Sequence, residues 1–376
     1  MPQIALKLEK EQDVSGFTMS NARPGEQVIV LTKAALTSDQ QEFYGYVEHI
    51  SKVFLARANV FVNDVSQCLV LIHNHLTADI YVNDFVVIVE IRAKRDLIGG
   101  QAIGIDDIAD IARLKFGQIK IKSTDKIIYC FKVGWKFGLY FNLDEKRSLD
   151  IEVIQKELGD LFRHLQFQHI FNVLENEGRF QDLMNDGWFP FLEIIGEDYK
   201  DLRALYDNRF DFHNRLNAFI DRFHEARTKM ISQKWWSHPL FADKRVLIEA
   251  GLDAYYRNDK KGFISCIKNL TPEIEGIIRL HYFGKTGKGK PKYSDLIEHV
   301  IELARAKSPS ATSLFLSKQF LEYLKKIFFA DFDLATGKLT LSRHSAGHGV
   351  AQEQDYEKIK ALQTILVLDQ LYFCMS

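Results

Sequence analysis

The sequence predicts an α+β module at its N-terminal end, followed by an all-α bundle at its C-terminal end. Short β-rich runs, several of them close to glycines, dominate residues 1–150. From about residue 150 onward, apolar side chains recur at steps of three and four, the spacing of helices with a buried face. A chain of 376 residues is too long for one ordinary domain. We therefore expect three segments: a module of unknown role at 1–150, a helical connector at 151–235, and a helical domain at 236–376.

Composition narrows the class of protein. The chain is 46% hydrophobic and 26% charged, which is typical of a globular protein with ample core. Its formal net charge of −1 creates no overall field for polyanions, so any contact with nucleic acid must come from local basic clusters. The four cysteines form no CxxC pair, and no apolar segment follows Met1 or approaches the length of a membrane span. We expect a cytoplasmic protein with reduced thiols and no membrane partner.

The N-terminal module is predicted from local runs rather than from a regular repeat. β-rich runs occupy 27–32, 81–92, 118–122 and 126–142, and helices are expected at 38–55 and 106–114. The run at 126–142 favours two paired strands, with Gly134 or Gly138 at a turn or bulge. The strand–helix alternation of a nucleotide-binding sheet is missing. The sequence leaves the role of this module open, with sensing or scaffolding as the two options.

His73 and His75 form a His-x-His pair in the same module. On a strand, both imidazoles would face one side, with Asp79 nearby, which is half of a metal site. The alternative is that both are ordinary polar residues on an exposed face or in a turn. The sequence offers no clear third ligand, so we expect no bound metal or other cofactor.

Helical periodicity then continues to the C-terminus. The connector is expected to contain helices at 151–165 and 167–174, a break at 187–190, and a long charged helix at 199–230. Its histidines, His213 and His224, are expected to be solvated or capping residues. In the helical domain, four helices are expected at 243–256, 261–283, 293–306 and 313–329. A fifth, after His348, is expected to carry one buried stripe that runs from Tyr356 to Tyr372.

A lysine-rich stretch lies between the second and third of these helices. Gly284 to Lys290 matches GxxxxGK, but Pro291 occupies the Ser/Thr position and a helix, not a strand, precedes the stretch, so we exclude a P-loop. What remains is a basic loop with Lys285, Lys288, Lys290 and Lys292. It is either a solvated loop or, if it lies beside an RNA-binding site, a loop that binds phosphates.

The segment Arg343-His344-Ser-Ala-Gly-His348 carries the strongest chemical signal. Arginine is a permanent planar cation suited to phosphate oxygens, and histidine exchanges protons near neutral pH. Cleavage of an RNA strand by its own 2′-hydroxyl requires proton transfer, and stabilisation of the charge that forms on the pentacoordinate phosphorus.

On a regular helix, Arg343 and His348 would point about 140° apart. We therefore place Arg343 on a loop and His348 near the start of the last helix, with Gly347 and Gly349 allowing the irregular backbone. His344 is a second acid/base, a hydrogen-bonding support or an exposed residue.

This segment resembles the RNase-type motif of the HEPN superfamily (higher eukaryotes and prokaryotes nucleotide-binding), in which Arg, a polar residue, a spacer and His enter the last helix of an all-α domain. Gly349 and the apolar run 361–371 also resemble the ending of uncharacterised bacterial HEPN proteins, and 270–279 resembles a recurrent helix of that group. Many members have Asn or Asp at the position of His344. The histidine changes which groups of the motif can exchange protons. The resemblance covers 236–376, and only faintly the 135–165 and 187–188 regions.

The resemblance implies a HEPN-like fold and a metal-independent endoribonuclease. Two copies of the helical domain would pack together with their Arg/His turns in one cleft, in a toxin–antitoxin or phage-defence setting with an antitoxin or regulatory partner. Arg343, His344 and His348 would be catalytic. Lys285, Lys288, Lys290, Glu275 and Arg279 would bind RNA, although Glu275 and Arg279, four apart, also fit a surface ion pair. Two alternatives remain: a non-catalytic HEPN-type module for nucleotide or RNA binding or for oligomerisation, and a metal hydrolase at His73 and His75.

Overall fold

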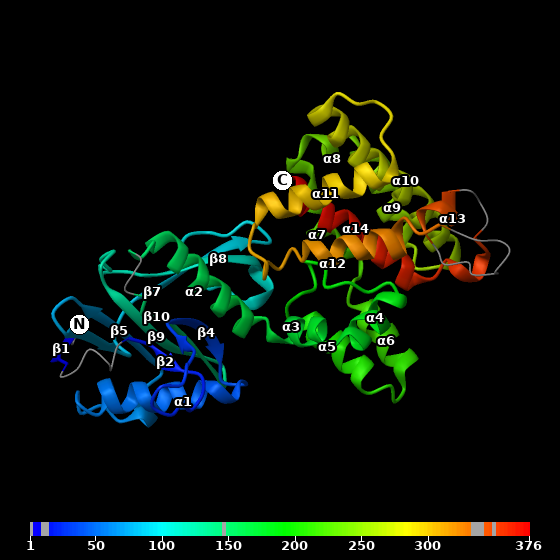
Figure 1. Ribbon diagram of the computed structural model, residues 1–376. Helices are drawn as coiled ribbons and strands as arrows, with labels where there is room; N and C mark the ends of the chain where they lie inside the picture. Colours follow the sequence, from blue (N-terminus) through cyan, green and yellow to red (C-terminus); the bar gives the residue numbers. More distant parts are fainter. Residues whose placement is uncertain (1–2, 9–14, 145–147, 332–341, 348–350) are drawn as a thin grey trace. The chain divides into compact units, whose positions relative to one another are not determined.

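The computed structural model describes residues 3–8, 15–144, 148–331, 342–347 and 351–376. The chain divides into two compact units. The first comprises Met1–Ile91 and Ile111–Gln168, and the second comprises Arg92–Asp110 and His169–Ser376. A β-rich N-terminal region is thus followed by a helical C-terminal region, which confirms the predicted α+β and all-α classes (Figure 1).

An antiparallel sheet forms the centre of the first unit. Its strand order is β1-β6-β5-β9-β10-β4. The strands span β1 (Gln3–Lys7), β4 (Lys33–Thr37), β5 (Gln67–His73), β6 (Thr77–Val82), β9 (Lys126–Val133) and β10 (Lys136–Asn142). The hairpin of β9 and β10 confirms the predicted pair of strands, with Gly134 at a positive φ in its turn. Two short ribbons pair β2 (Phe17–Thr18) with β3 (Val30–Leu31), and β7 (Val87–Ala93) with β8 (Ile108–Phe116).

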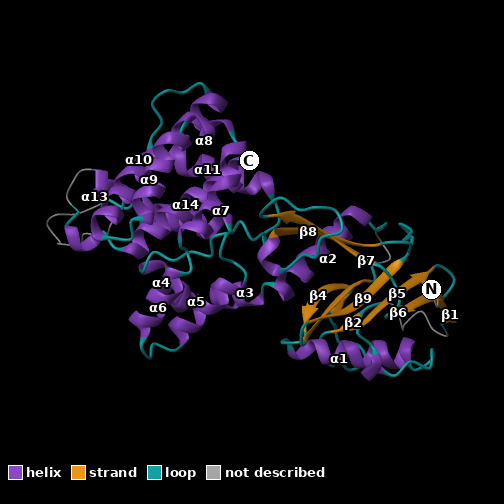
Figure 2. Ribbon diagram, turned by 180° about the vertical axis from the view of Figure 1, so that it is seen from behind, coloured by secondary structure: helices purple, strands orange, loops and turns teal. Residues whose placement is uncertain are grey.

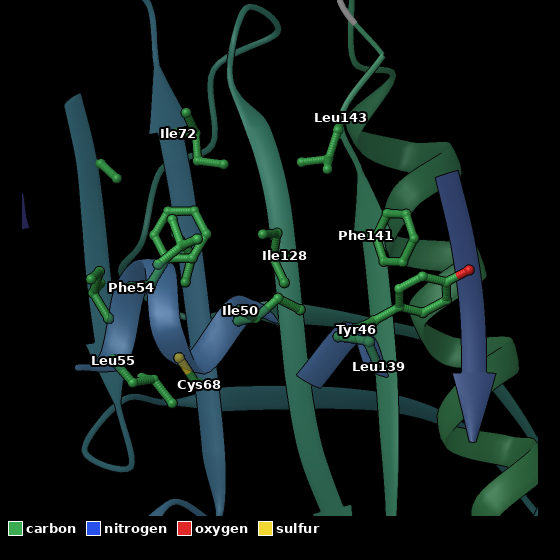
Figure 3. Close-up of a cluster of buried hydrophobic side chains, with 14 of the residues drawn as sticks. Tyr46, Ile50, Phe54, Leu55, Cys68, Ile72, Ile128, Leu139, Phe141 and Leu143 are labelled. Carbon is green, nitrogen blue, oxygen red and sulfur yellow. The ribbon is translucent and has the colours of Figure 1, made fainter. Parts of the chain in front are cut away.

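Each face of this sheet is covered by a helix, because alternate residues of β5 and β9 are apolar on both sides. One face packs on α1 (Gln41–Ile50) and the π-helical turn Ser51–Leu55. Figure 3 shows Ile50 and Phe54 from these segments beside Ile72 and Ile128 of the sheet. The other face packs on α2 (Ile151–Gln166). There, a side chain at Gly159 would meet the backbone of Arg113, so the close approach of α2 requires glycine.

Several local predictions for this region were wrong. Residues 106–114 are not a helix, because all but the 3₁₀ turn at Ile105–Asp107 belong to β8. Residues 118–122 form no strand, and the run at 81–92 is split between the end of β6 and β7. The dipeptides Ser38-Asp39 and Asp106-Asp107 open the two predicted helices and both resemble helix caps. The segment after Asp107 is nevertheless strand β8, which buries Ala109, Ile111 and Leu114. Packing overrides the local signal there.

The second unit is helical (Figure 2). Its helices are α3 (Gln168–Glu175), α4 (Glu177–Asn185), α5 (Glu197–Asp207), α6 (Phe212–Asp221), α7 (Glu225–Gln233), α8 (Pro239–Asp243), α9 (Arg245–Tyr256), α10 (Lys260–Thr286), α11 (Tyr293–Lys307), α12 (Ser317–Tyr323), α13 (Arg343–Gly347) and α14 (Lys358–Met375). The predicted long helix at 199–230 is wrong. It is three helices, broken at Asn208–Asp211 and Arg222–His224. No helix among the described residues has the length and apolarity needed to cross a bilayer.

The last helix, α14, differs from its prediction in burial. Instead of one stripe, nearly the whole of residues 361–375 is buried, and Figures 1 and 2 show α14 surrounded by other helices. Its polar side chains are therefore inside the unit, where they need partners. Gln370 Oε1 accepts the backbone N–H of Leu192 at 2.9 Å, and Gln363 Nε2 donates to the carbonyl of Asp186 at 2.8 Å. These bonds fix the segment between α4 and α5 against α14.

The β7–β8 connection belongs to the helical unit by its contacts. The Asp110 carboxylate accepts the hydroxyl of Ser313 at 2.9 Å and the backbone N–H of Leu314 at 3.4 Å. The Asp106 carboxylate accepts the backbone N–H of Glu197 at 3.2 Å. Arg92 donates to the carbonyl of Lys307. Residues 92–110 are thus tied by hydrogen bonds to the connections around α5, α11 and α12.

Candidate functional site

The predicted residues Arg343, Glu275 and Arg279 meet in the helical unit. Arg343, in α13, donates through Nε to Oε2 of Glu275, and Arg279 donates through Nε to Oε1 of the same carboxylate at 2.6 Å. The Glu275 side chain is only 8% exposed, whereas those of Arg343 and Arg279 are 23% and 37% exposed. One buried carboxylate therefore orients two guanidinium groups. The expected ordinary surface pair of Glu275 and Arg279 is instead a three-residue cluster.

Tyr293, the first residue of α11, packs against both cations. Its ring centroid lies 5.4 Å from the guanidinium carbon of Arg279 and 5.5 Å from that of Arg343. The imidazole of His344 meets the same ring edge-on, with centroids 4.8 Å apart. Cation–π attraction and the shared carboxylate thus hold the cluster from two sides. We call Glu275, Arg279, Tyr293, Arg343 and His344 the arginine cluster.

The start of α13 is fixed by serines. Ser342 Oγ donates to the carbonyl of Ala330 at 2.7 Å, and the hydroxyl of Ser345 accepts the N–H of Ser342 at 2.8 Å. Arg343 therefore lies in the first turn of a short helix, and its expected place on a loop was wrong. His348, the predicted proton-transfer residue, lies outside the described residues.

His344 is the third predicted catalytic residue. Its side chain is 12% exposed, and its Nε2 lies 3.7 Å from a carboxylate oxygen of Asp331. Of the options for His344, the exposed polar residue does not fit this position. A supporting or proton-exchanging residue does.

The predicted lysines lie on the connection between Arg279 and Tyr293. Lys285 is in the last turn of α10, which ends at Gly287 in the left-handed conformation, and Lys288 and Lys290 follow in the loop. All three are exposed. The end of this loop touches the cluster, because Nη1 of Arg279 donates to the carbonyl of Pro291 at 3.4 Å. The lysines thus flank the arginine cluster along the chain.

The described hollows beside Arg343 are small. One of about 40 Å³ is lined by Lys268, Thr271, Pro272, Arg343, Ala346 and Gly347. Another of about 30 Å³ lies against Ser342, Arg343 and Lys360. Ligand pockets are usually about 300–1,000 Å³, so these two accept little more than a water molecule each. Neither of these two hollows by itself holds a nucleotide.

The His-x-His pair has a different geometry from the one expected. His73 ends strand β5, whereas His75 lies in the following turn with φ of 68°, so the two imidazoles do not share a strand face. His73 instead bridges two carboxylates: Nδ1 lies 2.8 Å from Asp125 and Nε2 3.1 Å from Asp79. Within the described part of the chain, no group of three or more His, Cys, Asp or Glu side chains is arranged to hold a metal ion.

We expect His73→Gln to destabilise the protein more at pH 5.5 than at pH 8.5. Burial alone would lower the pKa of His73, but its hydrogen bonds to Asp125 and Asp79 outweigh burial and raise it. The charged bridge therefore contributes its full stability below the unfolded pKa of about 6.5, and loses it as pH rises through the folded value. Urea midpoints at both pH values measure the difference. His75→Asn, which tolerates the positive φ, is the control, and an equal loss at both pH values would contradict the expectation.

Tyr293 is the member of the cluster that sequence reasoning missed. The sequence predicts Tyr293 only as the start of a helix, and the one weak signal for it is an aromatic residue directly after a basic loop.

Comparisons of the chain with protein-family models, with curated proteins and with solved structures found no match.

Proposed function

We propose that this chain is a metal-independent endoribonuclease that cleaves RNA through attack by the 2′-hydroxyl. The observation that carries the proposal is the arginine cluster: Arg343 is held by a buried carboxylate, with Arg279 and His344 beside it. Two guanidinium groups around one carboxylate leave a net positive charge, which suits the phosphate of an RNA strand. The resemblance of 343–348 to the HEPN motif supplies the reaction type.

Each residue has a role in the proposed reaction. Arg343 stabilises the extra negative charge on the pentacoordinate phosphorus. His348 exchanges the proton, either with the attacking 2′-hydroxyl or with the leaving 5′-oxygen. His344 assists as the second histidine, and Arg279 with Lys285, Lys288 and Lys290 holds the flanking phosphates. Glu275 contacts Arg343 rather than RNA, so it positions the arginine.

A second copy of the chain would complete the site. The two hollows described beside Arg343 are too small for a nucleotide, and a second copy would supply the rest of a cleft for RNA. Large apolar side chains on α9 and α10 are exposed, namely Val246 (78%), Leu247 (49%), Leu280 (45%) and Phe283 (53%). Leu280 directly follows Arg279. Exposed apolar side chains on α9 and on α10, the helix that carries Arg279, suit a homodimer interface.

The biological setting is part of the same proposal. An RNase that acts on cellular or phage RNA needs control, and a toxin or defence effector would be held by an antitoxin or a regulatory partner. The N-terminal unit would then sense or regulate. Its sheet, covered by helices on both faces, adds no candidate chemistry to the arginine cluster.

The competing function is a module that binds nucleotide or RNA, or only oligomerises, without cleavage. Incubation of labelled RNA with the full chain in excess EDTA separates the two. We expect cleavage that leaves 2′,3′-cyclic phosphate and 5′-hydroxyl ends, loss of cleavage in His348→Ala, and normal cleavage in the exposed control Arg305→Ala. Binding without cleavage favours the competing module. Cleavage that stops in EDTA would show that the reaction depends on metal.

A further inference from the structure

A larger cavity lies in the helical unit. It is open to solvent and has a volume of about 780 Å³ between α6, the start of α10 and residues 354–360. That volume falls within the usual range of about 300–1,000 Å³ for small-molecule sites. We call it the α14 cavity, because the first residues of α14 form one wall. The proposed RNA reaction does not use it.

The apolar part of the wall is aromatic. Phe212 of α6, Phe263 of α10 and Tyr356 line the cavity, together with Leu216 and Ile220. Tyr356 is only 3% exposed, and its hydroxyl has no hydrogen-bond partner among the described residues. That hydroxyl is itself closed off from solvent, so Tyr356 is a packed part of the wall rather than a hydrogen-bonding group for a ligand.

The polar part of the wall contains groups that can bind an anion. α14 has no side-chain cap, and Lys358, Ile359 and Lys360 of its first turn line the cavity, so N–H groups and the positive end of the helix dipole lie there. Lys360 Nζ donates to the carbonyl of Asp186 at 3.0 Å. Within the described part of the chain, no carboxylate forms an ion pair with Lys360 or with Lys260, which also lines the cavity. Lys358, by contrast, is paired with Asp221.

The acidic residues of the wall keep their charge, and two of them accept hydrogen bonds from neutral donors. The Asp186 carboxylate accepts the hydroxyl of Tyr206 at 2.7 Å, and the Asp355 carboxylate accepts the backbone N–H of Gln352 at 2.7 Å. Glu357 is exposed at the N-cap of α14. Lys360 and Lys260 therefore face a cavity whose remaining wall is partly aromatic and partly polar. This combination fits a planar organic molecule that carries a phosphate group.

We propose that the α14 cavity binds a small organic phosphate with a planar ring. Its phosphate lies at the N-terminus of α14 between Lys360 and Lys260, and its ring packs against Phe212 and Phe263. Lys360 also lines the small hollow that contains Arg343, so an occupant would lie one side chain away from the arginine cluster. The inference does not depend on RNA cleavage and is tested without it.

Pyridoxal 5′-phosphate is the probe, because it has the ring, the phosphate and an aldehyde. The lysine amine attacks the aldehyde carbon and water leaves, and borohydride then reduces the imine to a stable amine that peptide mass spectrometry locates. Burial lowers the pKa of Lys360, which leaves more of its amine unprotonated. At limiting probe, we expect Lys360 to be labelled before exposed lysines such as Lys288 and Lys290.

Competition and variants decide the ligand class. Phenyl phosphate is expected to protect Lys360 at concentrations about tenfold below those of inorganic phosphate, because it also buries its ring. Lys260→Gln is expected to weaken that protection about tenfold, because it removes one charge-assisted hydrogen bond to the phosphate. The exposed control Lys325→Gln should change nothing. Labelling spread over exposed lysines would overturn the site, and equal protection by the two phosphates would overturn the planar ligand. The comparison of the two phosphates is repeated with Phe263→Ala, whose fold is checked by thermal melting.

Discussion

Replacing Lys234 by Met is expected to lower the free energy of unfolding by about 3–5 kcal/mol, the usual cost of removing one partner from a buried ion pair. The Lys234 ammonium lies 2.9 Å from Asp369 and 3.2 Å from Glu193. The exposed fractions of these three side chains are 16%, 1% and 15%. Asp369, inside α14, also accepts the indole N–H of Trp235 at 2.7 Å. The variant would leave the buried Asp369 carboxylate without its ion-pair partner, with the Trp235 indole N–H still donating to it.

The loss should depend on pH. Burial raises the pKa of Asp369 to about 6, and Lys234 opposes the rise. Without Lys234, the pKa of Asp369 rises further. A carboxyl whose folded pKa is raised is favoured in its neutral form, so the cost is small below the unfolded pKa of about 3.9, grows as pH rises, and is complete above the folded value. We expect the difference from wild type to be larger at pH 8 than at pH 5.

Chemical denaturation at these two pH values measures the effect. Lys229→Met is the matched control, because Lys229 forms an exposed pair with Glu225 and such pairs contribute about 0–1 kcal/mol. A loss below about 1 kcal/mol for Lys234→Met would show that the buried site relaxes or admits water, and would contradict the expectation. A replacement of both Lys234 and Asp369 by apolar residues should cost less than the single change, since it leaves no carboxylate at position 369.

Helices were predictable from the sequence where one face is buried, and less so elsewhere. The 3.6-residue period located α2, α9, α10 and α11 within a few residues of their observed ends. The same period cannot tell a half-buried helix from a surrounded one, and α14 is buried on all sides because Gln363, Asp369 and Gln370 find partners inside. Strand β8 was missed because its burial depends on residues distant in the chain, including Tyr129 and Phe85 beside Phe116.

The site shows the same division between local and distant information. Glu275 and Arg279 share a helix face at a spacing of four, so their proximity was predictable from the sequence. That Arg343 joins the same carboxylate depends on α13 packing on α10, across 68 residues of chain. Only the family resemblance suggested it. Tyr293 has only a weak signal, its place directly after a basic loop, because an aromatic ring at a helix start usually indicates ordinary core packing.

Arg343→Ala is expected to slow RNA cleavage by about 100- to 1,000-fold, the usual cost of removing one group that stabilises transition-state charge. This expectation rests on the proposed reaction. The fold should survive, because Glu275 keeps its hydrogen bond to Arg279 at 2.6 Å and is not left as an unpaired buried charge. Equal thermal midpoints for the variant and wild type would show that any loss of cleavage is chemical.

Arg343→Lys tests which property of the arginine matters. Lysine keeps the charge but lacks the planar fork that donates to Glu275 through Nε and leaves the other nitrogens for phosphate. If the oriented fork stabilises the pentacoordinate phosphorus, the Lys variant should recover only a small part of the lost rate. If charge alone matters, it should approach wild type. The initial rate at saturating RNA, compared with that of Arg305→Ala, separates the two. A rate unchanged in Arg343→Ala would remove Arg343 from the reaction and leave the cluster as a binding or packing feature of α10, α11 and α13.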